Sequence, residues 1–320
     1  MPRLKLILNP QADHGHAAET GSRLRNVVEE QIRRREQSGQ SYDLSWVSTE
    51  GPRHAIELAR EAAQQGFDTV VAVGGDGTVH EVVNGLMQME QEKRPRLGVI
   101  PIGSGNDFAH NVGLPSDPLE AVRCTLGDHT RTVDVGLIVD ETGRREYWDN
   151  TIGIGFSGQV NIATRGKTRW RGFMLYLISV LETILFKPPA LNATVQFDAK
   201  PPVAKSFSML SICNGPREGG GFPVNPGAVM DDGLITYTVM RKMSRFNMLR
   251  MLPIVMKGRH LSLTRFFEAG TAQSIRVETD RTMAIHTDGE VFGPWEAGIR
   301  QVEASIVSAA VRVVWNCQGG

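Results

Sequence analysis

The sequence predicts two domains: an α/β domain with a parallel sheet, followed by a mostly antiparallel β-domain. Up to about residue 130, short β-branched runs alternate with segments of helical spacing, which is typical of parallel strands joined by helices. Beyond residue 131, short strand-like runs are separated by turn residues instead. Because chain termini often lie close together, we assign residues 1–130 and the tail 306–320 to the first domain, and residues 131–305 to the second.

The expected elements follow the hydrophobic pattern of each segment. Residues 68–75 form a continuous β-branched run, as expected of a parallel strand that is buried on both faces. In the first domain we expect strands at 3–10, 42–49, 68–75 and 96–103, and helices at 17–35, 54–66, 78–89 and 118–126. In the second we expect strands at 132–139, 145–156, 193–199, 206–215, 233–240, 274–280, 282–289 and 305–315, and helices at 173–186 and 244–257.

The composition excludes several classes of protein. The formal net charge is zero, so no overall attraction to nucleic acid or to an anionic membrane is expected. The cysteines, Cys124, Cys213 and Cys317, have no metal-like spacing, which is typical of a reducing compartment. The apolar run Phe173–Phe186 is shorter than the roughly 20 residues of a membrane-spanning helix. We expect a cytoplasmic protein without a secretion signal.

A glycine-rich turn with the sequence Gly-Gly-Asp-Gly-Thr joins a buried strand to a helix at residues 74–78. Glycines allow a ligand to approach the backbone closely, and the helix directs the positive end of its dipole to the same place, which predicts a phosphate site. Thr78 and Glu81 are predicted to form a capping box at the start of that helix. Asp76 would repel a bare anion, so we expect Mg²⁺ beside the phosphates. The alternative is an ordinary glycine-rich turn with an exposed aspartate.

Two further strand ends carry polar residues. Ser104, Asn106 and Asp107 follow the strand 96–103, where they offer a hydroxyl, an amide and a second carboxylate. Asn9 ends the first strand in the same way. Because the carboxyl ends of parallel strands meet at one edge of a sheet, these residues are predicted to line one crevice. The sequence has no P-loop motif, and no Rossmann fingerprint follows its first strand.

The order of the motifs along the chain resembles that of the diacylglycerol kinase catalytic-domain family. These motifs are Asn9-Pro10, Thr49, Gly74-Gly-Asp-Gly-Thr78, Pro101-x-Gly-x-x-Asn-Asp-Phe108 and Asp288-Gly-Glu290. The chain is similar to the soluble bacterial lipid kinases, which are related to sphingosine and ceramide kinases. The resemblance runs along nearly the whole chain. It implies an α/β domain like that of NAD kinases, a C-terminal β-sandwich domain, and ATP and Mg²⁺ in the cleft between them.

The resemblance also implies roles for individual residues. ATP is expected to contact the first loop, the residue after the second strand, the glycine motif and the turn after it. These residues are Asn9, Pro10, Gln11, Ala12, Asp13, Thr49, Gly74, Gly75, Asp76, Gly77, Thr78, Val79, His80, Ser104, Asn106 and Asp107. The first loop departs from the family, which has a small hydroxyl and a glycine directly after Asn-Pro where this chain has Gln11 and Ala12.

Two acids of the second domain are predicted to act on the acceptor alcohol. Asp288 and Glu290 are two residues apart, so in a strand both would face the same side. Transfer of a phosphoryl group to a hydroxyl needs a group that accepts the proton. By the resemblance, Glu290 is that base, Asp288 orients it and Asp76 arranges the metal. The alternative is a hairpin turn, since Asp-Gly is a favoured turn pair.

The segment Asn225–Tyr237 is similar to another motif of the family, in which an aspartate and main-chain oxygens hold a structural Mg²⁺. The resemblance places this metal on Asp232 and on the carbonyl groups of Val229 and Leu234. Oxygen ligands suit a hard cation. A hairpin turn is again the alternative.

Residues 165–186 combine basic residues, Trp170 and an apolar run. This composition fits a segment that rests on an anionic membrane surface, with the tryptophan at the depth of the headgroups. A core helix with a basic start is the alternative.

Together these features predict an ATP- and Mg²⁺-dependent lipid kinase of phospholipid biosynthesis, which contacts a membrane surface transiently to reach its substrate. Diacylglycerol is the first candidate substrate, and a sphingoid or ceramide lipid and phosphatidylglycerol are the alternatives. An NAD kinase shares the glycine motif but fits the later motifs less well. A catalytically silent regulator that binds nucleotide or lipid is the alternative of another class. No nucleic-acid partner is expected, and the oligomeric state stays open, with a homodimer among the options.

Overall fold

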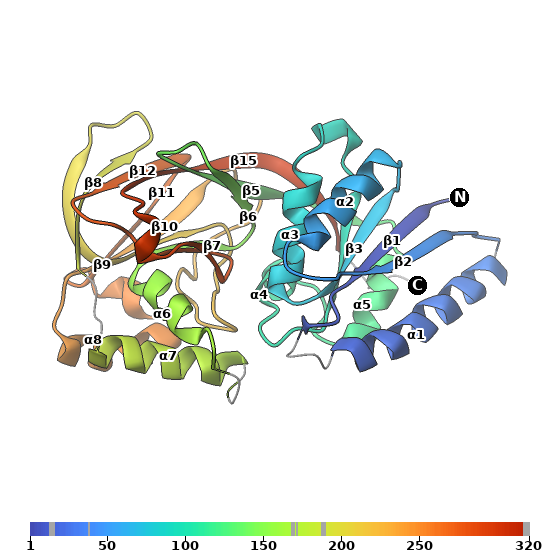
Figure 1. Cartoon of the computed structure of the whole chain (residues 1–320), viewed down its shortest axis with the longest axis horizontal. Coiled ribbons are helices and arrows are strands. Elements are labelled where there is room, and N and C mark those ends of the chain that lie inside the picture. The colour runs from blue at the N-terminus through green and yellow to red at the C-terminus, as the bar shows by residue number, and fades with distance from the viewer. Residues whose placement is uncertain (13–16, 38, 168–169, 171, 187–189, 316–320) are drawn as a thin grey trace. The chain divides into compact units, whose positions relative to one another are not determined.

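The computed structural model divides into two compact units, which are described separately (Figure 1). Unit 1 comprises Met1–Val133 and Ala309–Gly320, and unit 2 comprises Asp134–Ser308; the boundaries predicted at residues 130 and 305 differ slightly from these. The structure describes residues 1–12, 17–37, 39–167, 170, 172–186 and 190–315. The predicted fold class, an α/β domain with a parallel sheet and an antiparallel β-domain, is confirmed.

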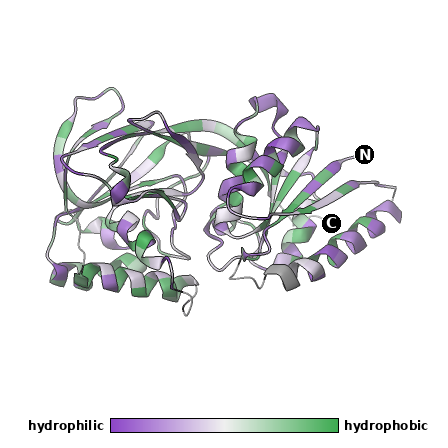
Figure 2. Ribbon diagram, in the orientation of Figure 1, coloured by the Kyte–Doolittle hydropathy of each residue, from purple (hydrophilic) through white to green (hydrophobic). Residues whose placement is uncertain are grey.

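The sheet of unit 1 is parallel. Its strands lie in the order β2-β1-β3-β4, and the end of β15 pairs in parallel with β4 through Val313 and Leu97. The central strand β3 is apolar and buried along its whole length (Figure 2). Helices connect β1 to β2, β2 to β3 and β3 to β4, as parallel strands require. The strands are β1 (Arg3–Leu8), β2 (Asp43–Ser48), β3 (Thr69–Gly74), β4 (Arg96–Pro101) and β15 (Gln301–Val314).

Helices cover both faces of this sheet (Figure 1). On one face, Leu4 and Leu6 of β1 share a hydrophobic core with Leu24 of α1 and Val122 of α5. On the other face, α2 and α3 pack against each other. The helices are α1 (Ala17–Gln37), α2 (His54–Gln64), α3 (Asp76–Leu86), α4 (Asp107–Asn111) and α5 (Pro118–Thr125).

Unit 2 is built of antiparallel strands around one hydrophobic core, in which Trp148, Phe207 and Phe292 are fully buried. The main path of its sheet is β14-β13-β7-β9-β8-β12-β15, while β10 pairs with β9 and β11, and β5 pairs with β15 and β6. The strands are β5 (Thr130–Asp140), β6 (Arg145–Trp148), β7 (Thr151–Gly155), β8 (Leu191–Phe197), β9 (Val203–Cys213), β10 (Ile235–Arg241), β11 (Phe267–Ala272), β12 (Ser274–Thr279), β13 (Ile285–Thr287) and β14 (Glu290–Gly293).

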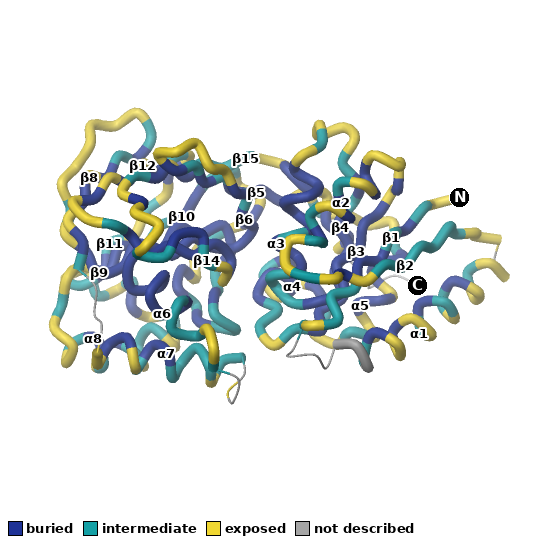
Figure 3. Tube along the Cα trace, in the orientation of Figure 1, coloured by how far each residue is buried: buried dark blue, intermediate teal, exposed yellow. Residues whose placement is uncertain are grey.

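Three helices lie against one side of these strands and turn their buried residues toward them (Figure 3). They are α6 (Phe156–Thr164), α7 (Gly172–Phe186) and α8 (Arg245–Met256). The sequence analysis missed α6, which follows β7 directly. A Cβ on Gly158 would lie 2.2 Å from the Ala284 carbonyl oxygen, so only glycine lets α6 approach the strands this closely. Among the described residues, no helix is long and apolar enough to cross a membrane.

Candidate functional site

The predicted phosphate-binding residues of unit 1 gather at the carboxyl edge of its sheet. Asn9 follows β1, Thr49 follows β2 and the glycine motif follows β3. Asn9 connects them, since its Nδ2 donates to Thr78 Oγ1 at 3.1 Å and its Oδ1 accepts from Thr49 Oγ1 at 3.5 Å. The same Oδ1 accepts from the Gln11 N–H at 3.0 Å, which shapes the first loop. One partly buried side chain thus connects three strand ends.

Gly75 and Gly103 bring the turns after β3 and β4 into backbone contact. A Cβ on Gly103 would lie 2.3 Å from the Gly75 Cα atom, so no larger residue fits there. Helix α3 begins at Asp76, and the geometry of a helix leaves its first N–H groups without partners inside the helix. These amides and the helix dipole point to the same turns, which is the arrangement that binds phosphate.

The predicted capping box is wrong. Helix α3 begins at Asp76 with Gly75 as its N-cap, so Thr78 lies buried inside the first turn. Glu81 instead accepts hydrogen bonds from the Arg53 and Ala55 N–H groups, at 2.7 and 3.1 Å. Its carboxylate therefore caps the start of α2 and connects that helix to α3.

Asp76 binds the backbone after the neighbouring strand β4, and Asn106 binds that of its own turn. Asp76 Oδ1 accepts from the Phe108 N–H at 3.0 Å, in the first turn of α4, a helix that the sequence analysis missed. Asn106, with a φ of 54°, bonds both the N–H and the carbonyl of Gly103, at 3.1 and 2.7 Å. These contacts hold the two glycine turns in shape. The Asn106 amide therefore shapes the turn.

The other predicted ATP contacts differ in exposure. Gln11 and Ser104 are exposed, and Asp107 is buried beside the second turn. Val79 and His80 have buried side chains, which makes them part of the packed face of α3. Pro10, Ala12, Gly75 and Gly77 are partly exposed, Gly74 is buried, and Asp13 lies outside the described residues.

In unit 2, Asp288 and Glu290 belong to a tight hairpin turn. Asp288 and Gly289, with φ of 51° and 87°, connect β13 to β14, and Thr287 pairs with Glu290 across the turn. Positive φ at both central residues is the form that Asp-Gly favours. The prediction that both acids face one side of a strand is therefore wrong. Asp288 is buried, whereas Glu290 is exposed.

The Asp288 carboxylate accepts three backbone hydrogen bonds. Its Oδ1 accepts from the N–H groups of Asn150 and Thr151, and its Oδ2 from that of Asp149, each at 2.8 Å. The Asp288 N–H donates in return to the Thr151 carbonyl at 2.8 Å. These bonds explain why the strand predicted at 145–156 is interrupted between β6 and β7. They also fix the turn that carries Glu290.

A buried polar network beside this turn was not predicted. His286 Nε2 lies 2.8 Å from Ser157 Oγ, which lies 2.7 Å from Glu218 Oε1. The Gly289 N–H donates to His286 Nδ1 at 3.3 Å, so the proton of the neutral ring is on Nε2. Burial lowers the pKa of His286, against the opposing effect of the Glu218 and Asp288 carboxylates. The neutral ring therefore connects the turn that carries Glu290 to Glu218.

The predicted metal ligands of unit 2 lie in the turn before β10. The exposed Asp232 accepts from the Leu234 N–H at 3.0 Å. The buried Asp134, which the sequence analysis did not single out, accepts from the Gly233 N–H at 2.7 Å. Two carboxylates and the main-chain oxygens of one turn form an oxygen-only donor set of negative charge, which fits a hard cation.

The fold and the two sets of residues define a class of protein, a two-domain phosphotransferase. The family model of the diacylglycerol kinase catalytic domain matches residues 3–138, and that of the YegS C-terminal NAD kinase beta sandwich-like domain matches residues 150–315. The chain belongs to the diacylglycerol kinase catalytic-domain family, as the sequence predicted, and is a kinase that phosphorylates an alcohol group.

Relatives and solved structures agree with this assignment. A protein named "Probable lipid kinase YegS-like" from Chromohalobacter salexigens is 33% identical over 77% of this chain and 76% of its own. A diacylglycerol kinase from Bacillus subtilis is 27% identical over 92% of this chain and 91% of its own. In fold, the chain is similar to a diacylglycerol kinase from Bacillus anthracis, with a TM-score of 0.71, 22% identity and coverage of 98% and 97%. An NAD kinase from Archaeoglobus fulgidus, solved with ATP, has a TM-score of 0.51, 12% identity and coverage of 98% and 94%.

The free energy of unfolding is expected to fall as the pH is lowered through about 6.5. Burial lowers the pKa of His286 and His260 below the ordinary 6.5, so below that pH the unfolded chain binds protons that the folded chain does not. Their stabilising effect is complete above the unfolded pKa and is lost as the pH falls. Each histidine contributes a slope of up to about 1.4 kcal/mol per pH unit. Denaturant unfolding between about pH 8 and pH 5 measures it.

A variant pair assigns the slope to its source. His286→Asn should flatten the dependence on pH, whereas the exposed His129→Asn should leave it as it is in the wild type. A wild-type free energy of unfolding that stays constant across this range would contradict the neutral, buried state of the two rings.

Proposed function

We propose that the protein transfers the γ-phosphoryl group of ATP to the hydroxyl of a lipid, with Mg²⁺ as cofactor. Diacylglycerol, which several relatives are named for, is the first candidate substrate. A sphingoid or ceramide lipid and phosphatidylglycerol are the alternatives. The observation that carries the proposal is the exposed Glu290 on a turn that Asp288 anchors with three backbone hydrogen bonds. A general base must be both accessible and held in position.

Each unit supplies one half of the chemistry. In unit 1, the glycine turns and the start of α3 bind the triphosphate. Asp76 and Asp107 would hold Mg²⁺, which neutralises charge on the phosphates. In unit 2, Glu290 accepts the proton of the lipid hydroxyl as that oxygen attacks the γ-phosphorus; the bond from the γ-phosphorus to the bridging oxygen breaks, and ADP leaves. Asp288 holds the turn, because both of its oxygens already accept backbone N–H groups.

A second Mg²⁺ is proposed in the turn before β10. Asp232 and the carbonyl groups of Val229 and Leu234 would hold it, with the nearby Asp134 adding negative charge. Its role is structural, since it stabilises the turn that leads into β10. The alternative function is that of a catalytically silent regulator. The presence of Asp76 and Asp107 in the glycine turns, and of Asp288 and Glu290 in the hairpin turn, argues against it.

An apolar cavity in unit 2 supports a lipid substrate. It has a volume of about 60 Å³ and lies between the three helices and the strands β9, β10 and β11. Methionines adapt to ligands of different shape because their side chains are unbranched and flexible. We propose that a lipid chain enters here. The apolar lining includes Phe156, Val180, Met209, Met240, Met248 and Met251.

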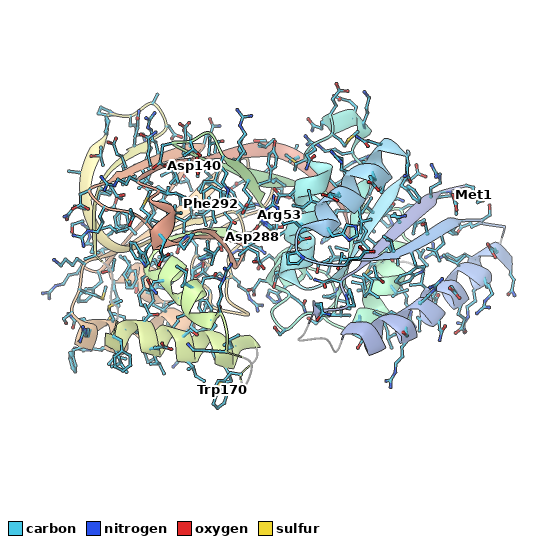
Figure 4. The ribbon with its side chains drawn as sticks, viewed as in Figure 1. Met1, Arg53, Asp140, Trp170, Asp288 and Phe292 are labelled. Atoms are coloured by element: carbon cyan, nitrogen blue, oxygen red, sulfur yellow. The ribbon has the colours of Figure 1, made fainter. Side chains whose placement is uncertain are left out.

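The surface of α7 and α8 is proposed to rest on the membrane. Helix α7 is mostly apolar, and its exposed Glu182 pairs with Lys167. Phe186 at the end of α7 is 72% exposed, and Phe246 of α8 is 73% exposed. Figure 4 shows the Trp170 side chain directed away from the ribbon. Arg169 and Arg171, part of the predicted basic start, lie outside the described residues. Exposed basic residues beside this surface are Arg165, Arg245, Arg250, Lys257 and Arg259.

Replacement of Glu290 is expected to abolish transfer with little effect on folding. Glu290→Gln keeps the size of the side chain but cannot accept a proton, so kcat should fall by about 100-fold or more while the melting temperature stays unchanged. The assay incubates the protein with labelled ATP, Mg²⁺ and dispersed diacylglycerol, ceramide, a sphingoid base or phosphatidylglycerol.

The exposed Glu278→Gln on β12 is the matched control and should retain wild-type activity. Equal labelling of every lipid by the wild type and Glu290→Gln would contradict the assignment of the base. The absence of labelling of any lipid by the wild type would contradict the proposed activity itself.

Loss of the exposed aromatic residues is expected to weaken membrane binding. Phe186→Ser together with Phe246→Ser should reduce sedimentation with phosphatidylglycerol-containing vesicles by at least about tenfold, because less apolar surface is buried. Leu119→Ser with Val203→Ser removes two other exposed apolar residues elsewhere, 50% and 49% exposed, and should have no effect. Equal sedimentation of the two double variants would show that this surface does not face the membrane.

A further inference from the structure

We propose that the cavity of unit 2 selects lipids with a hydrogen-bond donor, an amide N–H or a hydroxyl, beside their chains, over lipids with only ester groups there. The inference rests on the proposed lipid substrate and narrows its chemical class. It is drawn from two buried acceptor atoms, Glu218 Oε2 and His260 Nδ1, on residues that line the cavity. Neither atom accepts a hydrogen bond from any residue in the described parts of the chain.

Glu218 pairs one carboxylate oxygen with protein donors, whereas the other accepts no hydrogen bond from the described residues. Its Oε1 accepts from Ser157 Oγ and from the Tyr176 hydroxyl, each at 2.7 Å. His286 Nε2 lies 3.8 Å from Oε2. That distance exceeds a hydrogen bond, and the Nε2 proton has a partner in Ser157 Oγ at 2.8 Å. The side chain of Glu218 is therefore a buried acceptor with one unused oxygen, on a residue that is only 5% exposed.

His260 presents a second acceptor to the same cavity. Its Nε2 lies 3.0 Å from the Val224 carbonyl oxygen, which can only accept, so Nε2 carries the proton. The other nitrogen, Nδ1, is then an acceptor, and burial lowers the pKa of the ring and keeps it neutral. Phe267 packs edge-on against the ring and fixes its orientation.

The pairing rules decide which lipid fits. A lipid with only ester groups brings acceptors to a cavity whose unpaired atoms are acceptors too, so both sets stay unsatisfied. A lipid chain that fills the cavity excludes water from these atoms, so the ligand itself must supply the donors. A buried acceptor without a partner costs about 5- to 150-fold in affinity. An amide N–H or a hydroxyl beside the chain removes that cost.

Hydrogen bonds connect Glu218, which lines the cavity, to the turn that carries Glu290. From Glu218, hydrogen bonds run through Ser157 to His286, whose Nδ1 accepts from the Gly289 N–H. Gly289 directly precedes Glu290, the proposed base. A donor group held at Glu218 is thus bound by the same network that shapes the turn where the hydroxyl reacts.

Matched lipids test the selection without depending on catalysis. The probes are dioctanoylglycerol and its analogue in which the central ester is replaced by an amide, and calorimetry measures the affinity of the full-length protein for each in mixed micelles. The wild type should bind the amide at least about fivefold more tightly. Glu218→Gln places a donor where Oε2 was, so the preference should disappear or reverse. The exposed Glu278→Gln should keep it.

Three results would overturn the proposal: equal wild-type affinity for both lipids, wild-type affinity for neither, or a preference that survives in Glu218→Gln. The wild-type comparison stands even where that variant fails to fold. If the wild type prefers the amide but transfers no phosphate to any lipid, the selection holds and the kinase assignment of the preceding section fails.

Discussion

The hairpin turn between β13 and β14, which carries Glu290, depends on the buried carboxylate of Asp288. Asp288 accepts the N–H groups of three consecutive residues, 149–151, and returns one hydrogen bond through its own N–H. Removal of this carboxylate would leave buried amides without acceptors, at a cost of about 1–3 kcal/mol for each. Glu290 lies on the other side of Gly289 and reaches solvent. The position of Glu290 therefore follows from the carboxylate that anchors the turn.

In unit 1, polar side chains likewise hold turns in shape through hydrogen bonds to the backbone. The polar side chains of its motifs bind the backbone at the strand ends. Asp76 binds Phe108 after the neighbouring strand β4, and Asn106 binds Gly103 in its own turn. What the turns then present to a phosphate is mainly backbone N–H, with glycine where the two turns touch. In both units, rigid turns held by a carboxylate or an amide place the groups that meet the ligand.

The fold, and the convergence of the strand-end residues of unit 1, were predictable from the sequence because they depend on local patterns. The β-branched run of β3, and the glycines that end this strand, can be recognised in the sequence without knowledge of distant residues. The errors arose where a distant residue decides the local structure. Glu81 caps helix α2 through the N–H group of its N-cap residue Arg53, 28 residues earlier. The break after β6 depends on a hydrogen bond from Asp149 to Asp288, 139 residues later. No periodicity reveals such pairs, and the same holds for the contact between Ser157 and Glu218.

Hydrogen–deuterium exchange at residues 149–151 tests the anchoring role of Asp288 most directly. In Asp288→Asn, an amide nitrogen that cannot accept replaces one oxygen, so exchange of these N–H groups should speed up by about tenfold or more. In Glu290→Gln the same amides should exchange at the wild-type rate. Unchanged protection in Asp288→Asn, or an equal loss in both variants, would contradict the separation of the anchor from the base.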